Sequence, residues 1–284
     1  MSASVCDGLD FLQELLDSNV RGYSAMCTAR SALSTVLYVK IDNSGGYVKF
    51  ADHPFVKQFM KGVSNIKPVD CKYTEIWNPD VVLRMFKLPE WNLLEISDVM
   101  LVKKVVMLIL LATDQRGQII LALRKSAMMI SDKEIVFKVT NADLKQGRRG
   151  YKPQLIRMNR FSDQDLCPVR HIEEYLKRTD CLRGNEDRIF LISRKPFNPV
   201  SRDTVSRWTL DILKCAKIDT ECFSAGSTRS AAGSKASRKG VPLDVILSKG
   251  GWTQESTFAK FYNKKLQVQN FGNSFSDNIL AVDM

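Results

Sequence analysis

The spacing of apolar residues predicts helices along most of this chain. Residues 7–20 (DGLDFLQELLDSNV) place leucines on one face at the period of an amphipathic helix. Residues 78–88 (NPDVVLRMFKL) begin with Asn78 as a candidate N-cap, followed by Pro79 in the first turn. Similar patterns predict further helices at residues 23–39, 53–63, 98–112, 119–126, 167–179 and 201–218.

The apolar period changes to two in one part of the chain. Residues 134–140 (EIVFKVT) and 151–158 (YKPQLIRM) alternate as extended segments, and NADLKQGRRG joins them, which predicts a β-hairpin with a basic tip. A short apolar strand is expected at residues 188–193 (RIFLIS). The predicted fold class is therefore mainly α with a small antiparallel β-sheet.

Residues 88–97 (LPEWNLLEIS) interrupt the helical period and form the candidate linker between two domains. A chain of 284 residues, 44% of them hydrophobic, is long enough to bury a core in each domain. We therefore expect a helical domain over residues 1–90 and a second domain over residues 97–284.

Residues 224–240 (SAGSTRSAAGSKASRKG) have the composition of a flexible linker, yet they contain Arg229 and Arg238. The regular apolar segment VPLDVILSKGGW follows at once. We interpret the stretch as the first turns of a helix whose small side chains allow neighbouring helices and a charged ligand to approach.

Basic residues are in excess and concentrated. The chain carries 42 Lys and Arg against 31 Asp and Glu, a net charge of +11. Residues 224–265 hold eight basic and two acidic side chains, so their balance of +6 is over half of the total. Such a concentration favours a binding surface for nucleic acid or an anionic membrane over a merely solubilising role.

The seven cysteines include no C-x-x-C pair, and His53 and His171 are the only histidines. This composition favours neither a disulfide framework nor a zinc site, and we expect no metal or other cofactor. The N-terminus lacks the basic and apolar parts of a signal peptide, and the most apolar run, residues 105–112, is too short to cross a bilayer. The sequence predicts a soluble intracellular protein with no membrane partner.

Five side chains form the candidate chemical site. Arg116 lies where one predicted helix ends and another begins, a position suited to anion binding. Lys145 lies in the hairpin tip, Arg229 begins the small-residue helix, and Trp252 and Tyr262 follow. Each has an ordinary structural explanation, as a helix cap, a solvated lysine or an aromatic packing residue. Their joint order carries the signal.

That order resembles the tyrosine recombinase (phage-integrase-like) family of DNA breaking-and-rejoining enzymes. Residues 113–123 (TDQRGQIILAL) are similar to its first arginine box, and the Lys145 hairpin is similar to its lysine hairpin. GSTR stands at the H-x-x-R box, GGW at the family's His or Trp, and Tyr262 follows Trp252 by ten residues. Longer segments, among them HPFVKQFMKGV and GVPLDVILSKGGW, resemble the DIRS-like and Ngaro-like retrotransposon branch.

The resemblance implies an N-terminal helical core-binding (SAM-like) domain followed by a tyrosine recombinase catalytic domain. Tyr262 would attack a phosphodiester and form a 3′-phosphotyrosine without a metal. Arg116 and Arg229 would hold the non-bridging oxygens, and Lys145 would protonate the leaving 5′ oxygen. Trp252 would donate its indole N–H to the phosphate.

Gly226 departs from the pattern, because the family has a histidine three residues before its second arginine. Three interpretations stay open. The enzyme works more slowly with water or a neighbouring group as base, or it is a decayed or repurposed copy that binds DNA and cuts poorly, or the box is out of register.

The expected partners are double-stranded DNA and further copies of the chain, as a dimer or tetramer, in the nucleus or elsewhere inside the cell. A recombinase or integrase of mobile-element DNA is the first hypothesis. A non-catalytic DNA-binding derivative is the second, and a type IB topoisomerase, which has large additional domains, is the third. The tail after Lys265 docks on its own domain or on a neighbouring protomer. The candidate DNA contacts are Arg30, Lys57, Lys61, Arg148, Arg149, Lys235 and Arg238.

Overall fold

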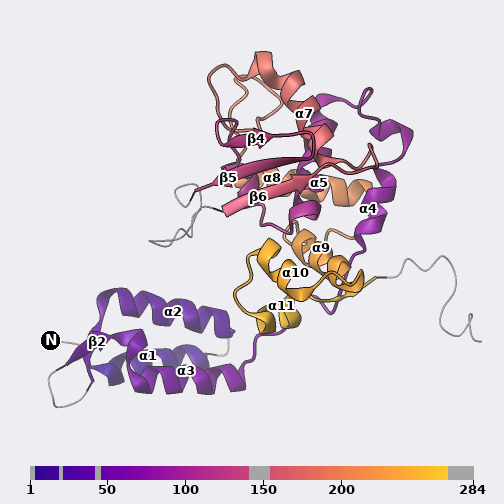
Figure 1. Ribbon diagram of the computed structural model, residues 1–284. Helices are drawn as coiled ribbons and strands as arrows, with labels where there is room; N and C mark the ends of the chain where they lie inside the picture. The colour runs from indigo at the N-terminus through magenta and orange to yellow at the C-terminus, as the bar shows by residue number, and fades with distance from the viewer. Residues whose placement is uncertain (1–3, 19–21, 42–45, 141–153, 268–284) are drawn as a thin grey trace, which may run out of the picture. The chain divides into compact units, whose positions relative to one another are not determined.

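The chain divides into two compact units, Met1–Lys72 and Tyr73–Met284. The computed structural model describes residues 4–18, 22–41, 46–140 and 154–267 (Figure 1). Each unit has its own hydrophobic core.

The first unit is a small helical domain with one β-hairpin. Its helices are α1 (Val5–Asp17), α2 (Tyr23–Val36) and α3 (Pro54–Ile66), and its hairpin pairs β1 (Tyr38–Lys40) with β2 (Tyr47–Lys49). The core side chains come from all of these parts: Leu12, Met26, Val39, Phe50, Val56, Met60 and Val63. The helices agree with the prediction except that α2 ends at Val36, so that the end of the predicted helix 23–39 forms β1, and the hairpin was not predicted.

Local contacts explain where two of these helices begin. Ser4 and Asp7 form a capping box at the start of α1, in which each side chain accepts the other's backbone N–H. His53 caps α3, because its Nδ1 atom accepts the Phe55 N–H at 3.2 Å. One of the two histidines therefore has a structural role.

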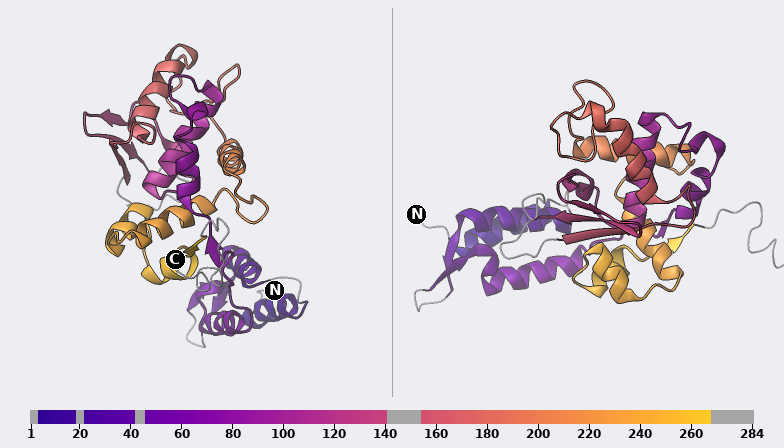
Figure 2. Two further views of the ribbon diagram at one scale, coloured as in Figure 1. Left: turned by 90° about the vertical axis from the view of Figure 1, so that its right-hand side faces the viewer. Right: turned by 45° about the horizontal axis from the view of Figure 1, so that its top comes forward.

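The second unit is built around α5 (Asp98–Thr113), a helix buried on nearly every side. It packs against α7 (Pro168–Thr179), α8 (Arg202–Cys215) and α9 (Ser227–Arg238), as Figures 1 and 2 show. The remaining helices are α4 (Pro79–Met85), α6 (Gln118–Ala122), α10 (Leu243–Gly250) and α11 (Glu255–Phe261). Because α5 has no polar face to expose to solvent, its apolar side chains must be covered on all sides by neighbouring elements.

A three-stranded antiparallel sheet lies against α5 and α7, in the order β4 (Met128–Ile130), β5 (Glu134–Val139) and β6 (Gln154–Asn159). The β5–β6 register runs from Glu134 opposite Asn159 to Val139 opposite Gln154. A separate parallel pair joins β3 (Glu75–Ile76) to β7 (Lys265–Leu266). The predicted class, mainly helical with a small antiparallel sheet, is confirmed.

The structure differs from the predicted elements at three places. Residues 188–193 form isolated bridges in place of a strand, and one of them pairs Leu191 with Pro199, which has no N–H to extend a ladder. The helix after Arg116 ends at Ala122, before the predicted residue 126. Trp91, Leu93 and Ile96, from the candidate linker, are buried in the core of the second unit.

No helix within the described ranges combines the length and the apolar character needed to cross a membrane.

Candidate active site

Arg116 is presented by the turn between α5 and α6. Asp114 ends α5 in the left-handed conformation, with φ of 53°, and so turns the chain after Thr113. The Gln115 side-chain amide donates to the Lys249 carbonyl and ties this turn to α10. Arg116 is exposed, and the described residues offer its guanidinium no hydrogen bond or ion pair. It is therefore free to bind an anion.

Arg229 lies on α9, the helix formed by the small-residue stretch. The residues from Ser227 to Ser234 are all buried, so this stretch is part of the packed unit and is not a tether. Gly233 shows why the residues are small, because an added Cβ there would lie 3.0 Å from the Phe258 ring. The close packing of α9 on α11 thus depends on the same small residues that give this stretch the composition of a linker.

The Arg229 guanidinium is 95% buried and incompletely satisfied. Its Nη2 donates to the Gly250 carbonyl, whereas Nε and Nη1 have no hydrogen-bond partner among the described residues. Burial, together with the nearby charge of Arg116, lowers the pKa of Arg229 to about 10, and Asp114 and Tyr262 oppose the decrease. A buried cation with unused N–H donors is prepared for an anionic ligand.

Tyr262 follows directly after α11 and is held through its backbone. Its N–H donates to the Phe258 carbonyl at 2.9 Å. Its own carbonyl accepts from the hydroxyls of Ser230 and Ser234, each at 2.8 Å. These two serines lie one turn apart on α9, so the helix that carries Arg229 also positions Tyr262.

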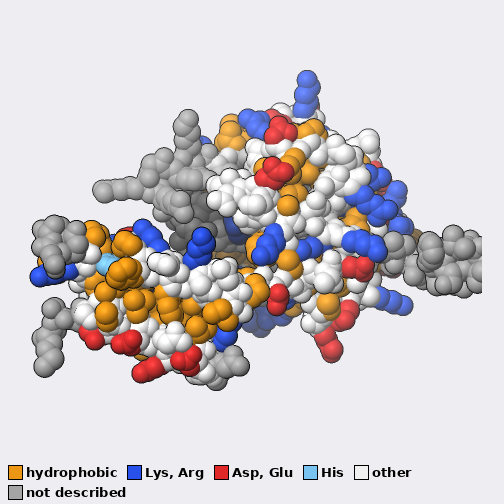
Figure 3. Space-filling model, turned by 90° about the horizontal axis from the view of Figure 1, so that it is seen from below, with side chains coloured by type: hydrophobic (Ala, Val, Ile, Leu, Met, Phe, Trp, Pro, Cys, Tyr) orange, Lys and Arg blue, Asp and Glu red, His pale blue; other side chains and the backbone are white. Residues whose placement is uncertain are grey.

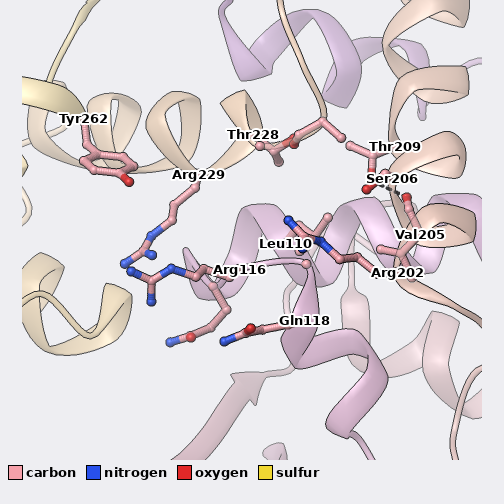
Figure 4. Close-up of a pocket in the computed structure, with 14 residues that line it drawn as sticks. Leu110, Arg116, Gln118, Arg202, Val205, Ser206, Thr209, Thr228, Arg229 and Tyr262 are labelled. Carbon is pink, nitrogen blue, oxygen red and sulfur yellow. Dashed lines mark hydrogen bonds between the residues drawn. The ribbon is translucent and has the colours of Figure 1, made fainter. Parts of the chain in front are cut away.

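Arg116, Arg229 and Tyr262 line one pocket with a volume of about 670 Å³. In Figure 4 the two guanidinium groups point toward one another, and the Tyr262 ring stands beside Arg229. Two like charges in one cavity repel, and a bound anion relieves that repulsion. The pocket therefore has the charge and the nucleophile that phosphoryl transfer requires.

Gly226 lies at the wall of the same pocket as the N-cap of α9. A Cβ added there would find its nearest neighbour, the Ser224 hydroxyl, at 3.8 Å. The position is thus open to a larger side chain, and no imidazole occupies it.

Neither histidine takes that place. His171 is buried on α7, where its Nδ1 atom lies 2.8 Å from the Cys167 carbonyl, and burial lowers its pKa to about 4. The described residues contain no cluster of His, Cys, Asp or Glu able to hold a metal ion.

Trp252 supports the site from behind and does not line the pocket. Its ring centroid lies 3.6 Å from the Arg229 Cζ atom and 3.8 Å from the Tyr262 ring centroid. Its indole Nε1 faces Asp114 Oδ2 at 3.5 Å. In this structure the indole N–H is thus directed to a carboxylate.

Asp114 was missed by the sequence reasoning, although it lies two residues before Arg116. Its side chain is buried, and its Oδ1 atom has no hydrogen-bond partner within the described ranges. Burial raises its pKa to about 7, while Arg229 and the Trp252 N–H oppose the increase. The sequence did contain a signal for Asp114, because it is an acidic residue at the predicted end of a helix and lies close to Arg116.

Other pocket residues were also missed, and they come from α8, from the α5–α6 region and from the start of α9. Arg202 is the first residue of α8 and is exposed at the pocket. The additional polar lining comes from Gln115, Gln118, Ser206, Thr209 and Thr228. The contribution of Arg202, Ser206 and Thr209 depends on α8 packing against α5, which no local pattern indicates.

The predicted DNA contacts have different surroundings. Lys57 and Lys61 are exposed on α3, and Arg238 is exposed on α9. Lys235 is partly buried and forms an ion pair with Asp80, and the buried Arg30 Nε has no hydrogen-bond partner among the described residues. Lys145, Arg148 and Arg149 lie outside the described residues.

Solved structures of a recombinase and of an integrase are similar to this chain. XerH site-specific recombinase, in a post-cleavage complex with a palindromic difH substrate, shares 13% identity at a TM-score of 0.55, over 90% of this chain and 67% of that chain. The Tn1549 transposon integrase in complex with transposon right-end DNA shares 11% identity at a TM-score of 0.53, over 98% and 84%. At these identities the likeness establishes the fold alone.

A comparison with curated protein sequences finds no relative. The profile of the phage integrase family, in contrast, matches residues 79–268, which is more than half of the chain and includes every pocket residue. The chain therefore belongs to the phage integrase family of tyrosine recombinases.

Proposed function

We propose that this protein breaks and rejoins double-stranded DNA through a 3′-phosphotyrosine intermediate. The observation that carries the proposal is the convergence of Arg116, Arg229 and Tyr262 on one pocket. These residues come from the α5–α6 turn, from α9 and from the end of α11, and the packing of these elements brings them to one pocket.

In the proposed reaction the Tyr262 oxygen attacks phosphorus, and the bond from phosphorus to the 5′ oxygen breaks. Arg116 and Arg229 bind the non-bridging oxygens and stabilise the charge of the transition state. The tyrosine proton passes to a base and the leaving 5′ oxygen takes a proton from a general acid. The phosphotyrosine ester retains the energy of the broken bond, so the reverse attack by a 5′ hydroxyl rejoins the strand.

Two steps are assigned on resemblance. Lys145 is the proposed general acid. Gly226 leaves no imidazole to assist the base, and the open space beside it admits water. We therefore propose a slower enzyme, in which water or a neighbouring group accepts the proton.

The alternative function is a DNA-binding protein derived from a recombinase, with little or no cleavage. The absence of the imidazole at Gly226 specifically favours this alternative. Both functions share the same DNA partner.

We propose mobile-element DNA as the substrate, in a protein of the DIRS-like branch that acts in the nucleus as a dimer or tetramer. The named structures with the same fold contain a difH substrate and a transposon end. In Figure 3 Lys and Arg side chains are spread over the face in view, among Asp and Glu side chains. The exposed basic residues from α9 to β7 include Arg238, Lys239, Lys249, Lys260 and Lys265. In this proposal the helical unit at residues 1–72 is the second half of a DNA clamp.

A nicked-duplex assay tests the proposal. The nick lets the cleaved end diffuse away, so a covalent adduct accumulates and migrates slowly in a denaturing gel. A pool with a randomised centre removes the need to know the target. We expect an adduct with the natural chain and none with Tyr262→Phe.

Two other results decide between the remaining hypotheses. Salt-sensitive DNA binding without any adduct supports the binding-only alternative. Relaxation of supercoiled plasmid without a specific site supports a topoisomerase.

A further inference from the structure

The chain that enters the second unit runs between two parts of the candidate active site. This segment, residues 73–78, contains β3. Glu75 and Ile76 pair in parallel with Lys265 and Leu266 of β7, and the Gln267 N–H donates to the Ile76 carbonyl at 2.7 Å. The 73–78 segment therefore holds the chain that directly follows Tyr262.

The same segment also holds the first turn of α9. The Trp77 indole N–H donates to the Ser227 hydroxyl at 2.8 Å, and both side chains are buried. The Tyr73 hydroxyl lies 2.9 Å from the Ser224 hydroxyl and accepts the Ser224 N–H at 3.2 Å. These contacts lie on either side of Gly226, which is three residues before Arg229.

Tyr262 is thus fixed from both directions. Its carbonyl is bound by Ser230 and Ser234 of α9, and the Lys264 N–H donates to Ser234 at 2.8 Å. The chain enters β7 at the next residue, Lys265, and Leu266 is buried beside β3. A nucleophile needs such restraint, because a displacement of about 1 Å costs roughly a hundredfold in rate.

We infer that Trp77 and Tyr73 are positioning residues of the cleavage site. Through the Ser227 and Ser224 contacts they set the first turn of α9, and the β3–β7 pair sets the segment after Tyr262. The 73–78 segment thereby holds Arg229 and Tyr262 at their working separation. The expected effect on the rate of adduct formation rests on the proposed function. The expected effect on the rigidity of the two segments rests on the contacts alone.

A double-mutant cycle tests the Trp77–Ser227 contact with Trp77→Phe, Ser227→Ala and both together. Each single change leaves one buried polar group unsatisfied, whereas the double change removes both groups. The double variant should therefore lose less unfolding free energy than the two single variants lose together. Trp91→Phe is the matched control, because Trp91 is a buried tryptophan of the same unit whose indole is outside this segment. Thermal unfolding of each variant verifies that it folds.

The first readout is amide hydrogen exchange, which does not require activity. We expect Trp77→Phe to speed exchange about tenfold in residues 224–230 and 262–267 and to leave α7 unchanged. The Trp91→Phe control leaves both segments unchanged. Unaltered exchange in these segments in folded Trp77→Phe overturns the inference.

The second readout is the single-turnover rate of adduct formation at saturating DNA. We expect Trp77→Phe to lower this rate about tenfold and to change the DNA affinity less than twofold, because positioning affects the chemical step. An unchanged rate in an active protein overturns the inference. If the natural chain forms no adduct, the proposed function fails, and hydrogen exchange alone decides the positioning role.

Discussion

The guanidinium of Arg229 stacks on the indole of Trp252, with its Cζ atom 3.6 Å from the ring centroid. The same indole lies beside the Tyr262 ring, so one aromatic side chain supports both the second arginine and the tyrosine. The stack orients a guanidinium whose Nε and Nη1 are unpaired within the described residues, and it leaves those donors available to a phosphate.

Replacing Arg229 by lysine should abolish most of the chemistry and little of the DNA binding. Lysine keeps the charge but loses the planar fork and the stack on Trp252. We expect the adduct rate to fall by about 10²–10³-fold. Binding, measured by fluorescence anisotropy, should change far less, because one phosphate contact is lost among many. Arg238→Lys, at an exposed position on the same helix, is the control, and equal losses in both variants would contradict the role of Arg229.

Gly226→His should raise cleavage. The position lines the pocket and has open space around its Cβ, so an imidazole fits without displacing backbone. General acid–base assistance contributes typically 10²–10⁴-fold, and we expect a gain of about 10²-fold in adduct formation. Gly62→His is the control, because a Cβ added at Gly62 meets no atom within 4 Å, and it should change nothing. An active protein that gains nothing from Gly226→His would show that the slot has been misassigned.

Gly250→Ala should disturb the support of the site. An added Cβ would lie 2.2 Å from Trp252 Nε1 and 2.7 Å from Asp114 Oδ2, so the indole has to move. Overpacking of this kind costs about 1–3 kcal/mol of unfolding free energy. We expect a lower melting temperature together with a slower adduct rate. Gly62→Ala is the matched control, and a variant as stable and active as the natural chain would refute the close packing.

Asp114→Asn should change how stability depends on pH. Burial raises the folded-state pKa to about 7, above its value of 3.8 in the unfolded chain, so the folded state binds the proton more tightly. This contribution to stability is complete below pH 4 and is lost as the pH rises through 7. Asparagine does not titrate, so the variant does not lose this contribution. Between pH 4 and 8 its unfolding free energy should rise relative to that of the natural chain by a few kcal/mol, as an order of magnitude. Denaturant titrations at several pH values measure this gain, and parallel pH profiles would contradict a buried, titrating carboxyl.

Lys57 and Lys61 test the helical domain as a DNA contact. Both are exposed on α3. If each neutralises one phosphate, the double alanine variant should reduce the slope of log affinity against log salt by about two. Lys67→Ala is the control, because the Lys67 ammonium already donates to the Leu16 carbonyl at 3.3 Å. An unchanged slope would remove these two lysines from the interface.

Much of the fold was predictable because its determinants are local. The caps at Asn78 and the apolar spacing of α1, α3, α5, α7 and α8 are encoded within a few turns of chain. The strands β3 and β7 were not predictable. Each has two residues, and their pairing joins Ile76 to Leu266 across most of the chain, which no period in the sequence indicates.

The candidate site divides in the same way. The sequence by itself determined the order Arg116, Arg229, Trp252 and Tyr262, the glycine at position 226 and the small-residue helix, because residue identity and local spacing are sufficient for each. Only the tertiary structure decided that the two arginines meet at one pocket, that Asp114 is buried beside Trp252 and that the 73–78 segment holds both α9 and the chain after Tyr262. These relationships arise from packing between elements that are distant in sequence, where burial and long-range hydrogen bonds, and not local periodicity, set the geometry.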